Sequence, residues 1–315
     1  MKKIFKIAVV AALVFIVVFI LNQQSITPPP QNSTVENETL GKNVTSYPIV
    51  FVHGWMGKAI DYQEYGIKLD KEGIGKYMGL VEADANISIC TLKWPNDTVV
   101  SAGYYTEANK DTGIAEYAKE LNHAIELIRA CTGSEQVILV AHSMGGLVSR
   151  KYMADYGDLH VKKLITLATP HYGFNVFTRG EIILMMLRLF TGRENEVEEM
   201  RPNSDFLQAL DKADISYREK MVSIGTYSSA NKTLAYGLPV FQSEILNFEK
   251  QRFNNSDVIV KLDSTKLAGT KYYQIEGCSH TEFLNFRNSY PKGPINNPNT
   301  CLDAYYIVKK EILLS

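Results

Sequence analysis

The stretch Gln136-Val-Ile-Leu-Val-Ala-His-Ser-Met-Gly-Gly146 decides the fold of this protein. Its first part is a short apolar run without alternation, which is typical of a strand buried on both faces. From Met144 to about Tyr156 the residues favour a helix, and Gly157 would end it. The stretch therefore predicts a buried strand that turns sharply into a helix.

Apolar runs and helix-period segments alternate on both sides of this stretch. The best helix is 111–131, whose apolar residues recur every three or four positions. Asp111 or Thr112 would cap its start, and Gly133 would end it. Strands that lack alternation and are separated by helices indicate a doubly wound α/β domain with a mostly parallel sheet. The further strands are expected at 48–52, 87–92, 161–167, 220–224 and 271–276.

Ser143 lies in the tight turn between the central strand and its helix. Ala141-His-Ser-Met-Gly145 fits the G-x-S-x-G pattern, with Ala as the first residue. Small residues are needed two positions before and after the serine, and Ala meets that steric demand. The helix N-terminus also carries partial positive charge, which favours a developing anion. We therefore predict that Ser143 is a nucleophile rather than an ordinary turn serine.

A serine nucleophile needs a histidine base and an acid that orients it. After a strand–turn–helix nucleophile, the chain order is acid and then histidine on the final loop. His280 follows the last expected strand and takes the base role, whereas His171 is expected to be a structural turn residue. Asp257, at the front of an apolar run, is the favoured acid, and Asp263 is the alternative. A helix or turn cap is the competing interpretation for either aspartate.

The anionic intermediate formed at Ser143 would also need backbone N–H donors. One is expected from Met144, the residue after the nucleophile. The second is expected from the turn after the first strand, where Gly54 allows close approach. By its position Trp55 supplies that donor, with Met56 as the less favoured choice.

These segments together resemble the bacterial true lipases of the α/β-hydrolase superfamily, over about residues 47–285. The chain departs from that pattern at Ala141 and at Val258, where the lipases usually have Gly. The stretches that carry the resemblance are 47–54 with 65–67, 137–150, 165–173 with its T-P-H-x-G turn, 257–267 and His280.

The resemblance implies an α/β-hydrolase fold with a helical cap insertion, and hydrolysis of carboxylic esters through an acyl-Ser143 intermediate. It implies no cofactor, and because no convincing counterpart of the lipases' calcium ligands is found, no metal is expected. The substrate would be an ester or lipid-like small molecule. An acyltransferase on the same site and a non-catalytic cell-surface binding protein are the alternatives, and the oligomeric state stays open.

The cap insertion is expected at about 174–215, within a hydrolase domain of residues 47–315. Its segment 181–190 is apolar on almost all sides, so it either lines an acyl pocket or is buried core. Glu194 to Glu199 is expected to form a solvated acidic edge.

The N-terminal residues indicate where the protein is displayed. An apolar run at 7–21 follows three lysines and has no cleavage site after it, so residues 1–21 are expected to be a signal anchor, or else a cleaved signal peptide. Residues 22–46 form a polar, Pro-rich linker. The hydrolase domain would then lie outside the cytoplasm at the membrane, or be secreted. Seven Asn-x-Ser/Thr sequons fit a glycoprotein: Asn32, Asn37, Asn43, Asn86, Asn96, Asn231 and Asn254.

Charge and cysteine content narrow the class further. The formal net charge is −1, and without the three N-terminal lysines the body is mildly acidic, which argues against nucleic acid as a partner. The four cysteines match no metal-binding spacing, and an even count outside the cytoplasm permits two disulfides. Cys278 with Cys301 is the favoured pair, and buried free thiols are the alternative.

Overall fold

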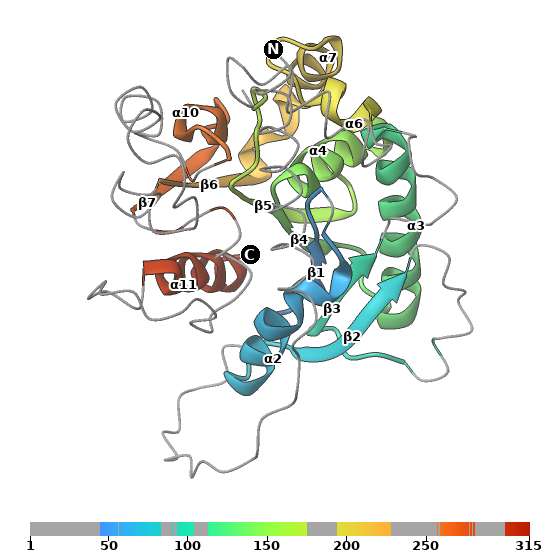
Figure 1. The fold of residues 1–315 in the computed structure, drawn as a ribbon. Helices are drawn as coiled ribbons and strands as arrows, with labels where there is room; N and C mark the ends of the chain where they lie inside the picture. The colour runs from blue at the N-terminus through green and yellow to red at the C-terminus, as the bar shows by residue number, and fades with distance from the viewer. Residues whose placement is uncertain are drawn as a thin grey trace, which may run out of the picture.

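A parallel β-sheet forms the centre of the computed structural model (Figure 1). The structure describes residues 45–55, 57–82, 90, 93–103, 113–174, 194–227, 257, 259–276, 278, 280 and 300–315. Within them the sheet has seven strands in the order β2-β3-β1-β4-β5-β6-β7, and each adjacent pair runs parallel. This confirms the doubly wound α/β fold. The strands are β1 (Ile49–Val52), β2 (Lys76–Glu82), β3 (Thr98–Gly103), β4 (Val137–His142), β5 (Val161–Leu167), β6 (Met221–Tyr227) and β7 (Lys271–Glu276).

Helices cover both faces of this sheet (Figure 1). On one face α2 (Gln63–Lys71) and α11 (Thr300–Leu313) pack against Ile49 and Phe51 of β1. On the other face α3 (Ile114–Thr132), α4 (Met144–Tyr156) and α7 (Asp205–Ala213) pack against Val50 and Val52. Alternate residues of β1 therefore enter two different cores, which explains why the strand is apolar throughout. The shorter helices are η1 (Ala59–Tyr62), α6 (Glu194–Glu199), η4 (Ile215–Lys220) and α10 (Leu262–Thr265).

The strands β2 and β3, at one side of the sheet, differ from the sequence prediction. The strand expected at 87–92 lies outside the described residues apart from Cys90, which is not in a strand. Beyond β1 the sheet continues instead with β3 and then with the edge strand β2, in which Gly79 has φ +98° beside a register shift. Because β2 is mostly exposed and interrupted in this way, it lacks the apolar run that marks the central strands.

The helix α3 begins and ends on glycines. Gly133 takes the left-handed conformation at its end, with φ +73°, as predicted. Its start differs from the prediction, because Gly113 occupies the N-cap position and Asp111 and Thr112 lie outside the described residues. The first free N–H group, that of Ile114, donates instead to Glu199 of α6, with an N···Oε2 distance of 2.6 Å.

The acidic segment Glu194–Glu199 is therefore not the solvated edge that was predicted. Glu196 is completely buried and accepts a hydrogen bond from the hydroxyl of Tyr117 on α3. Burial raises the pKa of Glu199, and the charge of Glu196 adds to that rise. These two side chains attach α6 to the first turns of α3, because their oxygens satisfy donors of that helix.

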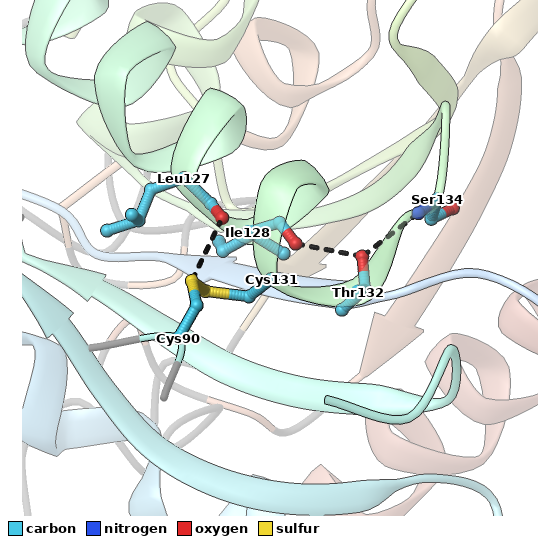
Figure 2. The surroundings of a disulfide bond; sticks show 6 residues. All are labelled: Cys90, Leu127, Ile128, Cys131, Thr132 and Ser134. Carbon is cyan, nitrogen blue, oxygen red and sulfur yellow. Dashed lines mark hydrogen bonds between the residues drawn. A yellow bond between two sulfur atoms is a disulfide. The ribbon is translucent and has the colours of Figure 1, made fainter. Parts of the chain in front are cut away.

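Both disulfides permitted by the cysteine count are present. Cys278 pairs with Cys301 of α11, as predicted, with a Cα–Cα distance of 5.1 Å. Cys90 pairs with Cys131 in the last turn of α3, at 5.0 Å, and Figure 2 shows Cys90 beside this end of the helix. No cysteine in the whole chain is free, so the alternative of buried free thiols is wrong.

Several expectations fall outside the described residues. They include the anchor or signal segment 1–21, almost all of the linker 22–46, and residues 175–193 of the cap insertion. Among the helices that the structure describes, none is long and apolar enough to span a membrane. Of the seven sequons, only Asn96 lies in a described part, in an exposed turn before β3.

Candidate active site

The turn between β4 and α4 holds Ser143 in a conformation that few residues adopt. Its φ is +53° and its ψ is −128°, and its N–H donates to the carbonyl of Leu167 on β5 at 2.8 Å. A non-glycine residue at positive φ is sterically strained, and such strain is characteristic of functional sites. The turn therefore presents Ser143 at the carboxyl end of the sheet and at the N-terminus of α4.

Small neighbours make this tight turn possible. A Cβ atom on Gly145 would lie 2.3 Å from the carbonyl oxygen of His53. On Gly146 it would lie 2.1 Å from Oγ1 of Thr169. Ala141, two residues before the serine, is completely buried. The departure from glycine at position 141 is therefore accommodated, while positions 145 and 146 require glycine.

Ser143, His280 and Asp257 are brought together in one chain of hydrogen bonds. Nε2 of His280 lies 2.9 Å from Oγ of Ser143, and Nδ1 lies 2.7 Å from Oδ2 of Asp257. The carboxylate can only accept, so Nδ1 carries the hydrogen and Nε2 is left to accept the proton of Ser143. The residues are 137 and 23 positions apart in the chain, and the fold assembles them at one edge of the sheet.

Burial and further hydrogen bonds fix the carboxylate of Asp257. The residue is completely buried, and its Oδ1 accepts hydrogen bonds from the N–H groups of Ile259 and Val260, at 3.0 and 2.7 Å. One oxygen therefore faces the backbone and the other faces His280. A buried carboxylate stays ionised only when such donors compensate its lost hydration.

The competing acid and base candidates lie in other surroundings. Asp263 is exposed in the first turn of α10. His171 is buried between Arg150, whose Nη1 lies 3.3 Å from Nδ1, and Thr166, whose Oγ1 lies 3.1 Å from Nε2. Burial, and then the charge of Arg150, holds the pKa of His171 well below its usual value. His171 thus belongs to a buried structural network.

The turn after β1 lies directly against Ser143. A Cβ on Gly54 would stand only 2.9 Å from Cβ of Ser143, so glycine is needed for the close approach. The half-buried Trp55 follows in this turn, and Met56 lies outside the described residues. Met144 is the first residue of α4 and is completely buried. Of the two expected oxyanion donors, Met144 directly follows Ser143 in the chain, and Trp55 directly follows Gly54, the residue that approaches Ser143.

A buried ion pair beneath α4 was missed by the sequence prediction. Nε of Arg150 lies 2.5 Å from Oδ2 of Asp214, and both side chains are completely buried. Arg218 also binds Asp214, at 3.1 Å. Arg150 gives no local sign of this pairing, because its partner is 64 residues away in the chain. The pair joins α4 to the residues that follow α7.

The described residues give no sign of a metal centre. Within the parts that the structure describes, no group of three or more histidine, cysteine, aspartate or glutamate side chains has the geometry to bind a metal ion.

Comparison with known proteins gives one family and several partial relatives. A family model described as "Alpha/beta hydrolase of unknown function (DUF915)" matches residues 37–233, which include Ser143 but neither Asp257 nor His280. A triacylglycerol lipase from Pseudarthrobacter phenanthrenivorans is 30% identical over 134 residues, covering 41% of this chain and 34% of the relative. The match thus spans about a third of the length of that lipase.

Solved structures show the same fold at low sequence identity. The mature lipase BlEst2 of Bacillus licheniformis is 17% identical, with a TM-score of 0.51 over 84% of this chain and 92% of that one. Phospholipase PlaB of Legionella pneumophila, in complex with thio-NAD, is 14% identical, with a TM-score of 0.55 over 84% of this chain and 61% of that one.

Proposed function

The chain belongs to the alpha/beta hydrolase family of unknown function DUF915, and from that premise we propose that it is a serine hydrolase of carboxylic esters. The observation that carries the proposal is the continuous hydrogen bonding from Ser143 through His280 to Asp257. The same hydrogen-bonded arrangement of nucleophile, base and acid recurs in serine hydrolases of unrelated folds. The partial relatives named as triacylglycerol lipases support an ester or lipid substrate.

In the proposed reaction, Oγ of Ser143 attacks the ester carbonyl carbon while Nε2 of His280 removes its proton. The negative charge of Asp257 stabilises the imidazolium that forms and keeps the ring in the correct tautomer. Backbone N–H groups of Met144 and Trp55 donate to the oxyanion. His280 then gives its proton to the leaving alcohol, and an acyl-Ser143 ester remains.

Water completes the cycle by the same steps in reverse order. His280 removes a proton from a water molecule, the resulting hydroxide attacks the acyl carbon, and the carboxylic acid leaves as Ser143 regains its proton. The proposed hydrolysis involves no change of oxidation state and requires no cofactor. An added alcohol in place of water would give a new ester, which is the acyltransferase outcome.

Labelling with a fluorophosphonate tests the proposal directly, because the reagent modifies only an activated serine. We expect the wild-type protein and Ser216→Ala, a change at an exposed serine of η4, to be labelled to the same extent. Ser143→Ala should not be labelled, and its turnover of p-nitrophenyl esters should fall by several orders of magnitude. Full labelling of the Ser143→Ala variant would show that the nucleophile is elsewhere.

We propose in addition that the enzyme acts outside the cytoplasm, held at the membrane by residues 1–21. The two disulfides support an oxidising compartment. Intact protein mass and fractionation of native cells test this. An unprocessed N-terminus in the membrane fraction is expected, whereas a mature protein that begins between residues 22 and 30 and is free in the medium would indicate secretion.

A further inference from the structure

The residue before the nucleophile, His142, makes a contact that the proposed mechanism does not use. It is the last residue of β4 and only 4% of its surface is exposed. Its Nε2 lies 2.7 Å from the backbone carbonyl oxygen of His280. The two imidazole rings lie 4.7 Å apart, tilted by 50°.

The chemistry of this contact fixes the state of the ring. A carbonyl oxygen only accepts, so Nε2 of His142 carries a hydrogen and donates it. Burial, and then the nearby charge of His280, holds the pKa of His142 well below its usual value. A neutral His142 adds no positive charge beside His280 when that residue takes up the proton of Ser143.

The backbone of His280 is consequently held on both sides. Its N–H donates to the carbonyl of Asp257 at 3.0 Å, and its carbonyl accepts from His142. His142 is the last residue of the buried strand β4 and Ser143 directly follows it, and the two contact His280 at its carbonyl oxygen and at Nε2 respectively. The end of β4 therefore fixes the distance between the proposed nucleophile, Ser143, and the proposed base, His280.

His142 also touches the turn that follows β1. A Cβ atom on Gly54 would lie 3.2 Å from Nδ1 of His142, so the ring packs close against this turn. The same side chain thus adjoins the turn that carries Trp55, the turn that carries Ser143 and the loop that carries His280. Three segments that are distant in sequence meet around it.

We propose that His142 is a positioning residue for the base of the hydrolase, and that its Nε2–H group holds the loop of His280 at the distance from Ser143 that proton transfer requires. The inference rests on the serine hydrolase function proposed above. Displacement of a reacting group by about 1 Å can cost about 100-fold in rate. Loss of this donor should therefore lower kcat and leave KM nearly unchanged, because His142 touches the base and not the substrate.

Two polar substitutions of His142 distinguish the effect of losing its hydrogen-bond donor from the effect of losing its imidazole ring. In His142→Gln the side-chain amide nitrogen takes a place like that of Nε2 and can reach the carbonyl of His280. In His142→Asn the amide nitrogen takes a place like that of Nδ1 and falls short. His123→Gln, at an exposed position on α3, is the control for a change of histidine to glutamine.

We expect H142Q and H123Q to hydrolyse p-nitrophenyl butyrate with kcat within about three-fold of wild type, and H142N to lose about 10- to 100-fold in kcat with KM within about three-fold. Thermal unfolding shows which variants are folded. Equal rates in wild type, H142Q and H142N would overturn the proposal, and so would equal losses in both variants. If H142N does not fold, a loss of more than ten-fold in folded H142Q overturns it.

A spectroscopic measurement keeps this result separate from the proposed function. The proton between Nδ1 of His280 and the carboxylate of Asp257 gives a resonance far downfield in the ¹H NMR spectrum. We expect that resonance in wild type and H142Q and expect it to shift or broaden in H142N. An unlabelled wild-type protein in the fluorophosphonate experiment would refute the hydrolase function, while an unchanged resonance in H142N would refute the role of His142.

Discussion

Ser143 stands on a turn that β4 and α4 hold from both sides, whereas His280 and Asp257 stand in loops that other parts of the chain must hold. Every residue of β4 is buried, and the turn uses contacts with its immediate structural neighbours, Leu167 and Gly54. The His280 loop depends on Asp257, on His142, and on the disulfide from Cys278 to α11. The position of the proposed nucleophile thus depends on local sequence, and the positions of the proposed acid and base depend on long-range contacts.

The largest expected effect is on the acid. Asp257→Asn should lower kcat by about 10³–10⁴-fold, because the amide no longer stabilises the imidazolium or keeps its tautomer. Asp263→Asn, at an exposed position in α10, is the matched control and should keep a rate close to wild type. Steady-state kinetics on a p-nitrophenyl ester measure both. A large loss in the control and none at Asp257 would exchange the two assignments.

The two disulfides test whether the position of His280 depends on long-range contacts, because only the Cys278–Cys301 bond lies next to His280 in the chain. They close 41 and 23 residues, so removal of either pair by Cys→Ser changes should cost about 3–4 kcal/mol of unfolding free energy. Urea unfolding should show similar losses for both. Removal of the Cys278–Cys301 bond should in addition lower kcat about ten-fold, because Cys278 precedes His280 by two residues. Removal of the Cys90–Cys131 bond should leave kcat unchanged. Equal kcat values in the two variants would show that the position of His280 does not depend on the Cys278–Cys301 bond.

Gly145→Ala tests whether the turn at Ser143, between β4 and α4, tolerates a displacement of its backbone. The added methyl group would press on the backbone oxygens of Val52 and His53, at 2.5 and 2.3 Å, and neither can move alone. We expect a loss of about 1–3 kcal/mol in stability, measured by thermal unfolding. A fall in kcat should accompany it, because the turn carrying Trp55 is pushed away from Ser143.

Gly79→Ala provides the control for that substitution. Gly79 has φ +98° and nothing within 4 Å of its Cβ position, so the change strains only the edge strand β2. It should lower stability by about 1 kcal/mol without changing kcat. A similar fall in kcat in both variants would mean that the turn at Ser143 is no more demanding than a distant strand.

The smallest effect is expected from Thr226→Val. Thr226 lies in β6, the last described strand before Asp257. Its hydroxyl donates a hydrogen bond to the carbonyl of Cys278. Its removal leaves that buried carbonyl without this donor and should cost about 1 kcal/mol in chemical denaturation. We expect kcat to stay within about three-fold, because His142 and Asp257 still hold His280. A ten-fold loss of kcat would show that Thr226 is as important to the loop as they are.

The same contrast explains what could be predicted from the sequence. The helix α4 and the strand β5 begin and end at the predicted residues, because apolar residues within them and Gly157 between them are local signals. The edge strand β7 also matches its predicted bounds, and Gly269 and Gly277 flank it. Ser143, His280 and Asp257 were selected from chain order and local pattern, and the structure brings these three together.

The remaining features depend on partners far away in the chain. The carboxylate of Glu199 accepts the hydrogen bond of the first N–H group of α3, from a position 85 residues away in the chain. A carboxylate in an acidic segment gives no local sign of such a role. The strand β2 was missed because its exposed edge carries little apolar signal. The contact of His142 with His280 spans 138 residues and follows only from the assembled sheet.

The hydrogen bond from Phe174 N to the carbonyl of Met200, at 3.1 Å, joins two residues within the region 174–215 where the cap insertion is expected. Next to it, Gly173 packs against Pro202, and Glu196 and Glu199 bind α3. The chain between residues 174 and 200 thus leaves and returns at one closed point on the framework. Because both ends of this segment meet at one point, we expect that a replacement of different length would leave the framework around Ser143 in place. Chimaeras joined at these two residues would test whether the segment determines which esters the proposed hydrolase accepts.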